Sequence, residues 1–295
     1  MLSLPPLLIG TLAAMACALP GNFLLLRRQS MLGDAVSHVV LPGIVAAFLL
    51  TGSVASLPML LGALAAALVS VIMIETIRHL ARIEPGAAMA IVFTSMFAAG
   101  VLALELSDTS SVHLDVEHAL YGNLESLIWI DAVGLHSLID PKALAGLPPQ
   151  LPRMAVVFLV IALMVWLFWR ALVISSFDEP YARAIGLPAR VIGFGLAAGS
   201  ALAAVAAFDA VGAIIVIAMF TCPPAAARMM TNHLGTQVGY SLGFAMLSAI
   251  GGYLLAGYGP LLFGSEHAVS AAGLIATVSG IILGLTAWLG PYRRG

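Results

Sequence analysis

Charged residues are scarce in this chain, and lysine is almost missing. Only 9% of the 295 residues are charged, and Lys142 is the single lysine, whereas soluble domains carry about 25% charged residues. So few charges cannot cover a water-exposed surface, and the composition therefore excludes an ordinary soluble protein. The formal net charge of −2 says nothing about nucleic acid, but the sequence has no basic patch to hold phosphates, so we expect no nucleic-acid partner.

Enzyme motifs are also missing. No GxxxxGK[ST] sequence occurs, so the chain has no P-loop for nucleotide phosphates, and neither HExxH nor GxSxG is present. Cys17 and Cys222 lie in apolar runs, and we interpret them as small buried hydrophobic residues without a disulfide. We expect no catalytic activity. Uphill transport would draw its energy from another chain or from an ion gradient.

Long hydrophobic runs make up most of the sequence, which is 61% hydrophobic. A transmembrane helix needs about 20 apolar residues, and nine such runs can be counted. They lie at roughly 4–26, 33–50, 54–77, 87–105, 153–173, 190–208, 210–228, 235–256 and 268–289. Because Met1–Leu19 has no basic n-region, we expect a first span there rather than a cleaved signal peptide. The sequence predicts an all-α polytopic membrane protein, with about eight to nine transmembrane helices in one domain over residues 1–295.

The arginines predict an orientation. Basic residues concentrate in cytoplasmic loops, and placing Arg27 and Arg28 in the cytoplasm puts most of the twelve basic residues there by alternation. Only Lys142 and Arg153 then fall outside. We expect an N-terminus outside and a C-terminus in the cytoplasm, in the cytoplasmic (inner) membrane.

An acidic residue and a histidine interrupt the second apolar run. Asp34 and His38 are four residues apart, so on a helix they lie on one face, one above the other. A carboxylate and an imidazole suit Mn²⁺, Zn²⁺ or Fe²⁺, and ionisable groups within a span are functional candidates by default. The pair predicts either a contact for a metal in transit or a structural, proton-relaying pair that holds the helix to its neighbours.

Two connections between spans stand out. The extracytoplasmic connection 106–152 is acidic and contains histidines. It is either a solvated loop with a short interfacial helix, or a docking surface or electrostatic funnel that raises the local cation concentration. In the cytoplasmic connection 175–190, the sequence Asp178-Glu179-Pro180 is typical of a helix start, and Gly186 and Pro188 end the helix. This short helix is either an ordinary linker or a contact surface for a partner.

Other polar and helix-breaking residues in the spans give weaker signals. Glu75 precedes Arg78 by three residues, which favours an ion pair at a span end. Asp209 lies at the outer junction of two spans, where it could bind a bare helix end or gate the outer mouth. Pro42 interrupts the second span, and it either borders a pathway or kinks a helix.

Glycines recur every four residues in the late spans. Gly235, Gly239 and Gly243 form such a series, and the pairs Gly195/Gly199 and Gly280/Gly284 repeat the spacing. Small residues at this spacing let helix backbones approach closely, so we expect close helix packing at these positions.

The sequence resembles a known family at three places, in the right order. Gly33-Asp34-Ala35-Val36-Ser37-His38 with Leu41-Pro42-Gly43 is similar to the GDAxSHxxLPG motif in the permeases of zinc/manganese ABC importers. The segment Asp178–Gly186 resembles the coupling helix of these permeases, and Asp209–Val216 followed by Pro223–Ala227 resembles their late-span motif.

The resemblance implies a type II ABC importer fold. It implies a second permease subunit, identical or different, two cytoplasmic ABC ATPase subunits and an extracytoplasmic metal-binding protein. Asp34 and His38 would line the metal pathway, with Pro42 and Asp209 as gate candidates. The residues that would couple to the ATPase are Phe177, Asp178, Glu179, Tyr181, Ala182, Arg183 and Gly186.

We therefore expect the permease subunit of an ATP-driven importer for Zn²⁺ or Mn²⁺, with no permanently bound cofactor. Two alternatives remain from the residues: a type II permease for a siderophore or cobalamin, and a proton-coupled secondary transporter. An intramembrane enzyme or structural subunit is the least favoured, because no catalytic constellation occurs in the sequence.

Overall fold

Long apolar helices make up almost all of the computed structural model, which describes residues 4–53, 55–106, 124–127, 129, 146–262 and 269–291. Nine helices in this described part are long and apolar enough to cross a membrane. The helices are α1 Leu4–Leu26, α2 Leu32–Thr51, α3 Ser56–Ala81, α4 Pro85–Leu106, α7 Gln150–Leu167, α8 Trp169–Phe177, α9 Glu179–Ala184, α10 Ala189–Val211, α11 Ala213–Met230, α12 Leu234–Leu262 and α13 Ala271–Leu289, with a 3₁₀ turn η1 at Leu124–Ser126.

The nine predicted spans agree with these helices within a few residues, with one exception. The span predicted at 153–173 already ends at Leu167, and Phe168 breaks the helical backbone before α8 begins. The prediction missed the break because neither glycine nor proline occurs there. After the break, Trp169 packs edge-on against Phe23 of α1, with ring centroids 5.7 Å apart.

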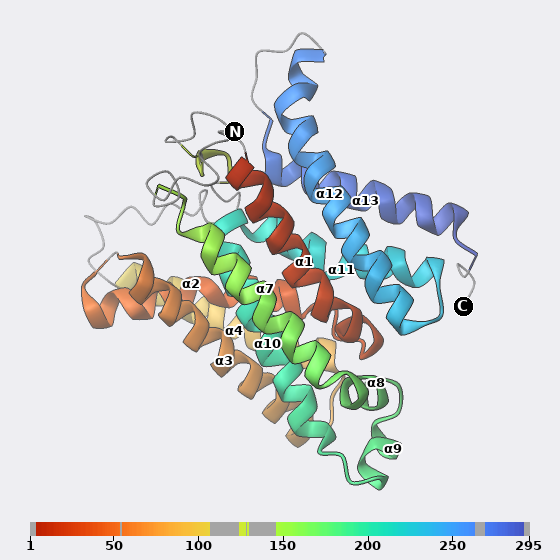
Figure 1. The fold of residues 1–295 in the computed structure, drawn as a ribbon. Coiled ribbons are helices and arrows are strands. Elements are labelled where there is room, and N and C mark those ends of the chain that lie inside the picture. Colours follow the sequence, from red (N-terminus) through yellow and green to blue (C-terminus); the bar gives the residue numbers. More distant parts are fainter. Residues whose placement is uncertain are drawn as a thin grey trace.

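Three helices form the centre of the bundle, and two groups flank them (Figure 1). The four spans with the largest buried fractions are α1, α2, α10 and α11. Helices α2, α3 and α4 pack together on one side and reach the centre through α10 and α11, while α12 and α13 pack against α1 and α11 on the other side. The short helices α8 and α9 lie at the end of the bundle opposite the N-terminus (Figure 1).

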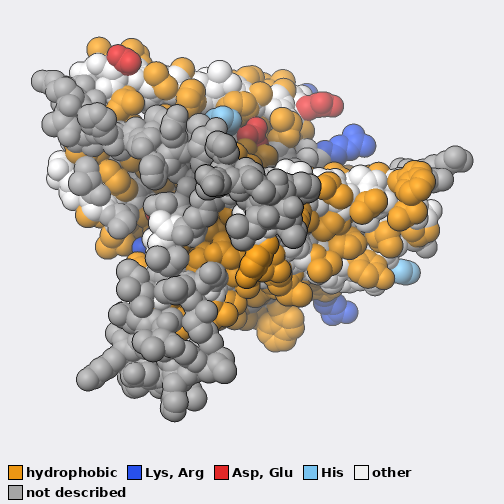
Figure 2. Space-filling model, turned by 90° about the horizontal axis from the view of Figure 1, so that it is seen from above, with side chains coloured by type: hydrophobic (Ala, Val, Ile, Leu, Met, Phe, Trp, Pro, Cys, Tyr) orange, Lys and Arg blue, Asp and Glu red, His pale blue; other side chains and the backbone are white. Residues whose placement is uncertain are grey.

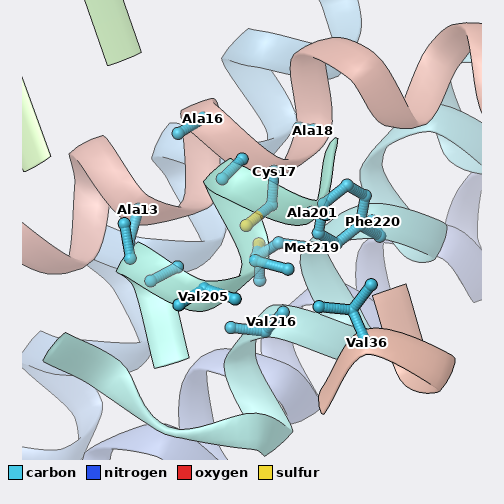
Figure 3. Packing of buried hydrophobic residues seen from close by; sticks show 14 of the residues in the cluster. Ala13, Ala16, Cys17, Ala18, Val36, Ala201, Val205, Val216, Met219 and Phe220 are labelled. Atoms are coloured by element: carbon cyan, nitrogen blue, oxygen red, sulfur yellow. The ribbon is translucent and has the colours of Figure 1, made fainter. Parts of the chain in front are cut away.

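Small side chains fill the core where the central helices meet (Figure 3). Ala13 and Cys17 of α1 lie beside Ala201 and Val205 of α10, and all four side chains are buried. Between helices in lipid, such close packing replaces the hydrophobic effect as the source of cohesion. Small side chains thus bring the helices close together, and large buried side chains such as Phe23 and Phe220 fill the remaining core.

One close glycine contact lies where prolines remove hydrogen bonds from the backbone of α11. A Cβ on Gly21 of α1 would lie 2.6 Å from the backbone oxygen of Phe220 in α11. Pro224 lacks the N–H that would bond this oxygen four residues earlier in the helix. The proline thus leaves a carbonyl without its usual partner at the point where α1 approaches most closely.

The predicted glycine series make few of the close contacts expected of them within this chain, and the exception is Gly199, where an added Cβ would lie 2.9 Å from Met164 of α7. A Cβ on Gly239, Gly243, Gly280 or Gly284 would meet no neighbouring atom within 4 Å, and Gly235 has only a distant neighbour. Other close approaches lie elsewhere. Gly43 of α2 faces Gly62 of α3, and Gly252 of α12 faces Ile275 of α13. A spacing of four residues is therefore not sufficient to identify a packed face.

The outer surface of the bundle is largely hydrophobic. In Figure 2 hydrophobic side chains cover most of the described surface, and charged side chains are few. Polar contacts occur in the interior instead: Gln237 of α12 donates a hydrogen bond from Nε2 to Oδ1 of buried Asn22 in α1, at 3.2 Å. An apolar exterior with polar groups turned to the interior is what a lipid environment favours, although Oε1 of Gln237 itself has no hydrogen-bond partner among the described residues.

Candidate functional site

The predicted metal pair lies in the first two turns of α2. Nε2 of His38 is 3.5 Å from Oδ1 of Asp34, so the spacing of four residues does stack the two side chains. Asp34 lies in the first turn of the helix, where the N–H groups and the helix dipole favour a negative charge. The pair is neither sealed nor fully open, since His38 is 42% exposed and Asp34 29% exposed.

Two aromatic side chains of α4 surround the imidazole of His38. The ring of Phe93 stacks on it with centroids 5.3 Å apart, and the ring of Phe97 meets it edge-on at 5.8 Å. These contacts restrict the rotation of the imidazole and hold its Nε2 near Asp34. Nothing in the sequence pointed to this aromatic support, because it comes from a helix more than fifty residues away.

The pair belongs to the less buried face of α2. Asp34, His38 and Pro42 are partly exposed at intervals of four residues and Ala46 is exposed, whereas Gly33 packs against the ring of Phe220 on the opposite side. Further along the same face, Pro42 and Ala46 line an open, almost purely apolar groove of about 620 Å³ between α2 and α3. Pro42 also packs against Gly100 of α4, where an added Cβ would lie 2.7 Å from the proline.

The donors of this chain do not make a complete metal site. Among the residues that the structure describes, no group of three or more His, Cys, Asp or Glu side chains is close enough to hold a metal ion. Asp34 and His38 together offer two ligands, fewer than the four or more that a tightly held transition metal takes. Such a pair can make a transient contact or half of a site shared with another chain.

The second predicted element, α9, has the expected boundaries. Asp178 caps the helix, because its carboxylate Oδ1 accepts a hydrogen bond from the N–H of Tyr181 at 2.8 Å. At the other end Gly186 adopts a left-handed φ of 83°, and the N–H groups of Gly186 and Leu187 donate to the carbonyls of Arg183 and Ala182. This double hydrogen bond is the Schellman motif that ends helices at glycine.

The outer face of α9 is apolar and exposed. Phe177 ends α8, Tyr181 lies within α9 and Ile185 is its C-cap, and these three apolar side chains are 57%, 56% and 48% exposed. The side chain of Ala182 is fully buried beneath the helix. Ala182 therefore packs against the rest of the bundle, and its part in coupling to an ATPase stays a prediction.

Charged groups of α9 pair within the helix. Arg183 donates a hydrogen bond to the carboxylate of Glu179, one turn earlier. Partial burial raises the pKa of Glu179, but this hydrogen bond and the charges of Arg183, Arg78 and Arg27 together lower the pKa below its ordinary value. Glu179 is thus held in its charged form.

An arginine that the sequence singled out only for orientation has long-range contacts. Arg27, directly after α1, donates from Nη2 to Oγ of Ser175 at 2.6 Å and from Nε to Oγ of Ser176 at 3.1 Å. Both serines are at the end of α8, immediately before the cap of α9. Sequence reasoning missed this contact because the partners are about 150 residues apart.

Two further ion pairs concern predicted residues. Nη1 of Arg153, at the start of α7, lies 2.5 Å from Oδ2 of Asp209 in the last turn of α10. Asp209 therefore binds a charged partner and not a bare helix end. Arg78 and Glu75 form the predicted pair at the end of α3, with 3.0 Å between Nη1 and Oε1.

The predicted extracytoplasmic funnel falls mostly outside the described residues. Its acidic and histidine residues before position 124 and between positions 130 and 145 are not described, and of the predicted interfacial helix only the turn Leu124–Ser126 is seen. Trp129 in the same connection is fully buried.

Comparisons with known proteins agree along the whole chain. The sequence pattern of the ABC 3 transport family matches residues 2–281. The manganese transport system membrane protein MntD of Bacillus subtilis is 36% identical over 272 residues, which cover 92% of this chain and 86% of that protein. The zinc transport system membrane protein TroD of Treponema pallidum is 33% identical over 284 residues, which cover 96% of this chain and 73% of that protein.

Solved structures have the same fold. PsaBC from Streptococcus pneumoniae in complex with Fab is similar with a TM-score of 0.72 and 26% identity, over 98% of this chain and 92% of the other. An inward-facing metal-chelate type ABC transporter is similar with a TM-score of 0.69, over 97% of this chain and 85% of the other. At 16% identity the second likeness concerns the fold alone. The expected all-helical permease fold is confirmed.

Proposed function

Because this chain belongs to the ABC 3 transport family, we propose that it is the membrane permease through which an ABC importer passes Zn²⁺ or Mn²⁺ into the cytoplasm. It is a multi-pass membrane protein and the transport subunit of a system whose ATPase is a separate chain. The observation that carries the cargo assignment is the Asp34–His38 pair, a carboxylate and an imidazole 3.5 Å apart within a transmembrane helix. The manganese and zinc systems of the relatives support the same cargo class.

The two side chains act as a transient binding step. Asp34 supplies an oxygen and His38 a nitrogen, the donor types that Mn²⁺ and Zn²⁺ accept. Two ligands bind weakly enough for the ion to leave again. A second permease subunit, identical or different, supplies the remaining ligands from its side of the contact between the two subunits.

Helix α9 transmits the work of ATP hydrolysis. The exposed face formed by Phe177, Tyr181 and Ile185 docks into a groove on one of two cytoplasmic ATPase subunits. The capped ends of α9 make it a rigid lever, because its backbone bonds are satisfied without the partner. An ATPase and an extracytoplasmic metal-binding protein are implied by membership of an ABC transport system.

The orientation follows from α9. If α9 meets the ATPase, the end of the bundle with α9 and Arg27 is cytoplasmic, and the N-terminus lies outside. The Arg153–Asp209 pair then lies at the extracytoplasmic end, where it ties α7 to α10 as a gate. Pro42, between Gly100 and the apolar groove, is the gate candidate beyond His38.

The test is metal uptake by the complete complex with its ATPase in proteoliposomes. Asp34→Ala and His38→Ala are each expected to abolish uptake of Zn²⁺ and Mn²⁺, because each removes half of the donor pair. Ser37→Ala is the matched control on the same helix, since Ser37 only bonds the Gly33 carbonyl of its own helix. The ATPase subunits must co-purify with every variant.

Three results would contradict the proposal. Normal uptake by both alanine variants would show that the pair is structural. Uptake of a chelated metal in preference to the free ion would identify a chelate permease. Uptake that follows a proton gradient and survives ATP depletion would identify a secondary transporter.

A further inference from the structure

The guanidinium of Arg27 lies where three elements meet. It extends from the end of α1 and donates to Ser175 and Ser176 at the end of α8. On α10, an added Cβ at Gly193 would lie only 2.7 Å from Nη1 of Arg27. Since α8 precedes α9 and α10 follows it, the guanidinium sits at the base of the loop that carries α9.

This position is unusual for a charged side chain. Burial lowers the pKa of the Arg27 guanidinium, and the nearby Glu179 opposes that effect. An arginine keeps its charge in proteins, so the group must find hydrogen-bond acceptors where it is. The two serine hydroxyls supply them in a forked geometry that a lysine cannot reproduce.

Arg27 is also the first residue of the tight corner between α1 and α2. Residues 27–31 form this corner, and the N–H groups of Arg28 and Gln29 bond the carbonyls of Leu25 and Leu24. Gln29 is buried. Because the corner has only five residues and its backbone is hydrogen-bonded to the end of α1, a displacement of Arg27 is passed on to the start of α2, where Asp34 lies.

We propose that Arg27 is the positioning residue that links the coupling helix α9 to the metal-bearing helix α2. A movement of α9 pulls on Ser175 and Ser176, these pull on Arg27, and the corner tilts Asp34 and His38. This inference rests on the proposed roles of α9 and of the Asp34–His38 pair. The new element is the mechanical connection between α9 and the Asp34–His38 pair, which is not part of either proposed role.

Two matched pairs of variants test the link. Arg27→Lys keeps the charge but loses the fork, and Arg170→Lys makes the same change at an exposed position of α8. Gly193→Ala pushes the guanidinium away from the serines, whereas Gly195→Ala on the same helix meets open space. The comparison within each pair removes the effect of composition and helix propensity.

The readout is metal transported per ATP hydrolysed by the complete complex. Arg27→Lys and Gly193→Ala are expected to lower this ratio about tenfold, the usual size of a coupling between sites. Their KM for the metal and the co-purification of the ATPase are expected to stay unchanged. The two control variants should keep the wild-type ratio.

A comparison with a combined variant adds a second readout. If the fork is the link, combining Arg27→Met with Ser175→Ala and Ser176→Ala lowers the ratio no further than Arg27→Met alone. Additive losses would overturn the proposal. A wild-type ratio in both Arg27→Lys and Gly193→Ala would overturn it too, and so would a loss explained entirely by missing ATPase subunits.

The outcome is separable from that of the proposed function. Normal uptake by Asp34→Ala and His38→Ala would refute the metal pathway, while the ratio in the Arg27 variants would still report whether ATP hydrolysis is linked to transport. Failure of the link alone would leave uptake by the wild type and its loss in the Asp34 and His38 variants as expected.

Discussion

At the scale of single residues, Arg28 occupies a position that normally belongs to glycine. It follows α1 with a left-handed φ of 58°, and its N–H and that of Gln29 form the same pair of hydrogen bonds that ends α9 at Gly186. A side chain in this conformation costs about 1–2 kcal/mol. The corner between α1 and α2 therefore stores a small strain next to the arginine that contacts α8.

Replacing Arg28 should release this strain. Arg28→Gly is expected to be more stable than Arg28→Ala by about 1 kcal/mol, because only glycine adopts the left-handed conformation without a steric cost. Both variants lose the same charge, so their difference isolates the backbone. Denaturant unfolding in detergent measures it, and equal stability of the two variants would show that the corner is unstrained.

At the scale of elements, α9 shows how a helix of six residues is specified locally. Its cap at Asp178, its acidic first turn and its glycine end all follow from the segment itself. A short helix gains little from propagation, so its two ends decide whether it forms. Buried Ala182 then holds the helix against the bundle, with its apolar side chains exposed on the outside.

Gly186, at the C-terminal end of α9, offers a test of the proposed contact between α9 and the ATPase. Gly186→Ala is expected to weaken retention of the ATPase about fivefold, because a strain of about 1 kcal/mol frays α9 before it docks. The added methyl group meets no neighbour, so the effect is confined to the backbone. Gly86→Ala, which also meets open space, is the control in a pull-down with the ATPase. Equal retention of the two variants would remove α9 from the interface.

At the scale of the whole molecule, few polar contacts hold the helices in place over long distances. Arg27 joins one end of α1 to α8, the Asn22–Gln237 bond joins α1 to α12, and Arg153–Asp209 joins α7 to α10. The rest is close apolar packing of small and large buried side chains. A bundle held in this way can shift between a few arrangements at modest cost, as a transporter must.

The Arg153–Asp209 ion pair, which we propose to lie at the extracytoplasmic end, can be tested as a gate. Asp209→Asn keeps the size of the side chain but removes its charge, and it is expected to raise metal flux in the absence of ATP. The expected loss of stability is at most about 1 kcal/mol, since the pair is partly exposed. Flux into proteoliposomes without ATP measures the effect, and Glu75→Gln, at the other end of the bundle, is the control. Unchanged flux would leave Asp209 with a purely structural role.

The properties that the sequence determined by itself are those set within one span or one turn. Hydrophobic length placed all nine spans, the spacing of four stacked Asp34 on His38, and capping residues bounded α9. Each depends on neighbours a few residues away, and helix geometry converts that spacing into position.

Only the tertiary structure decided which helices meet and what they bring together. It placed Phe93 and Phe97 around His38, put Arg27 on Ser175 and Ser176, and moved the close glycine contacts to Gly43 and Gly62. The physical reason is that every face of these helices is apolar. In lipid no hydrophobic stripe marks the packed side, so the partners follow from shape, and shape is settled only when the whole bundle is assembled.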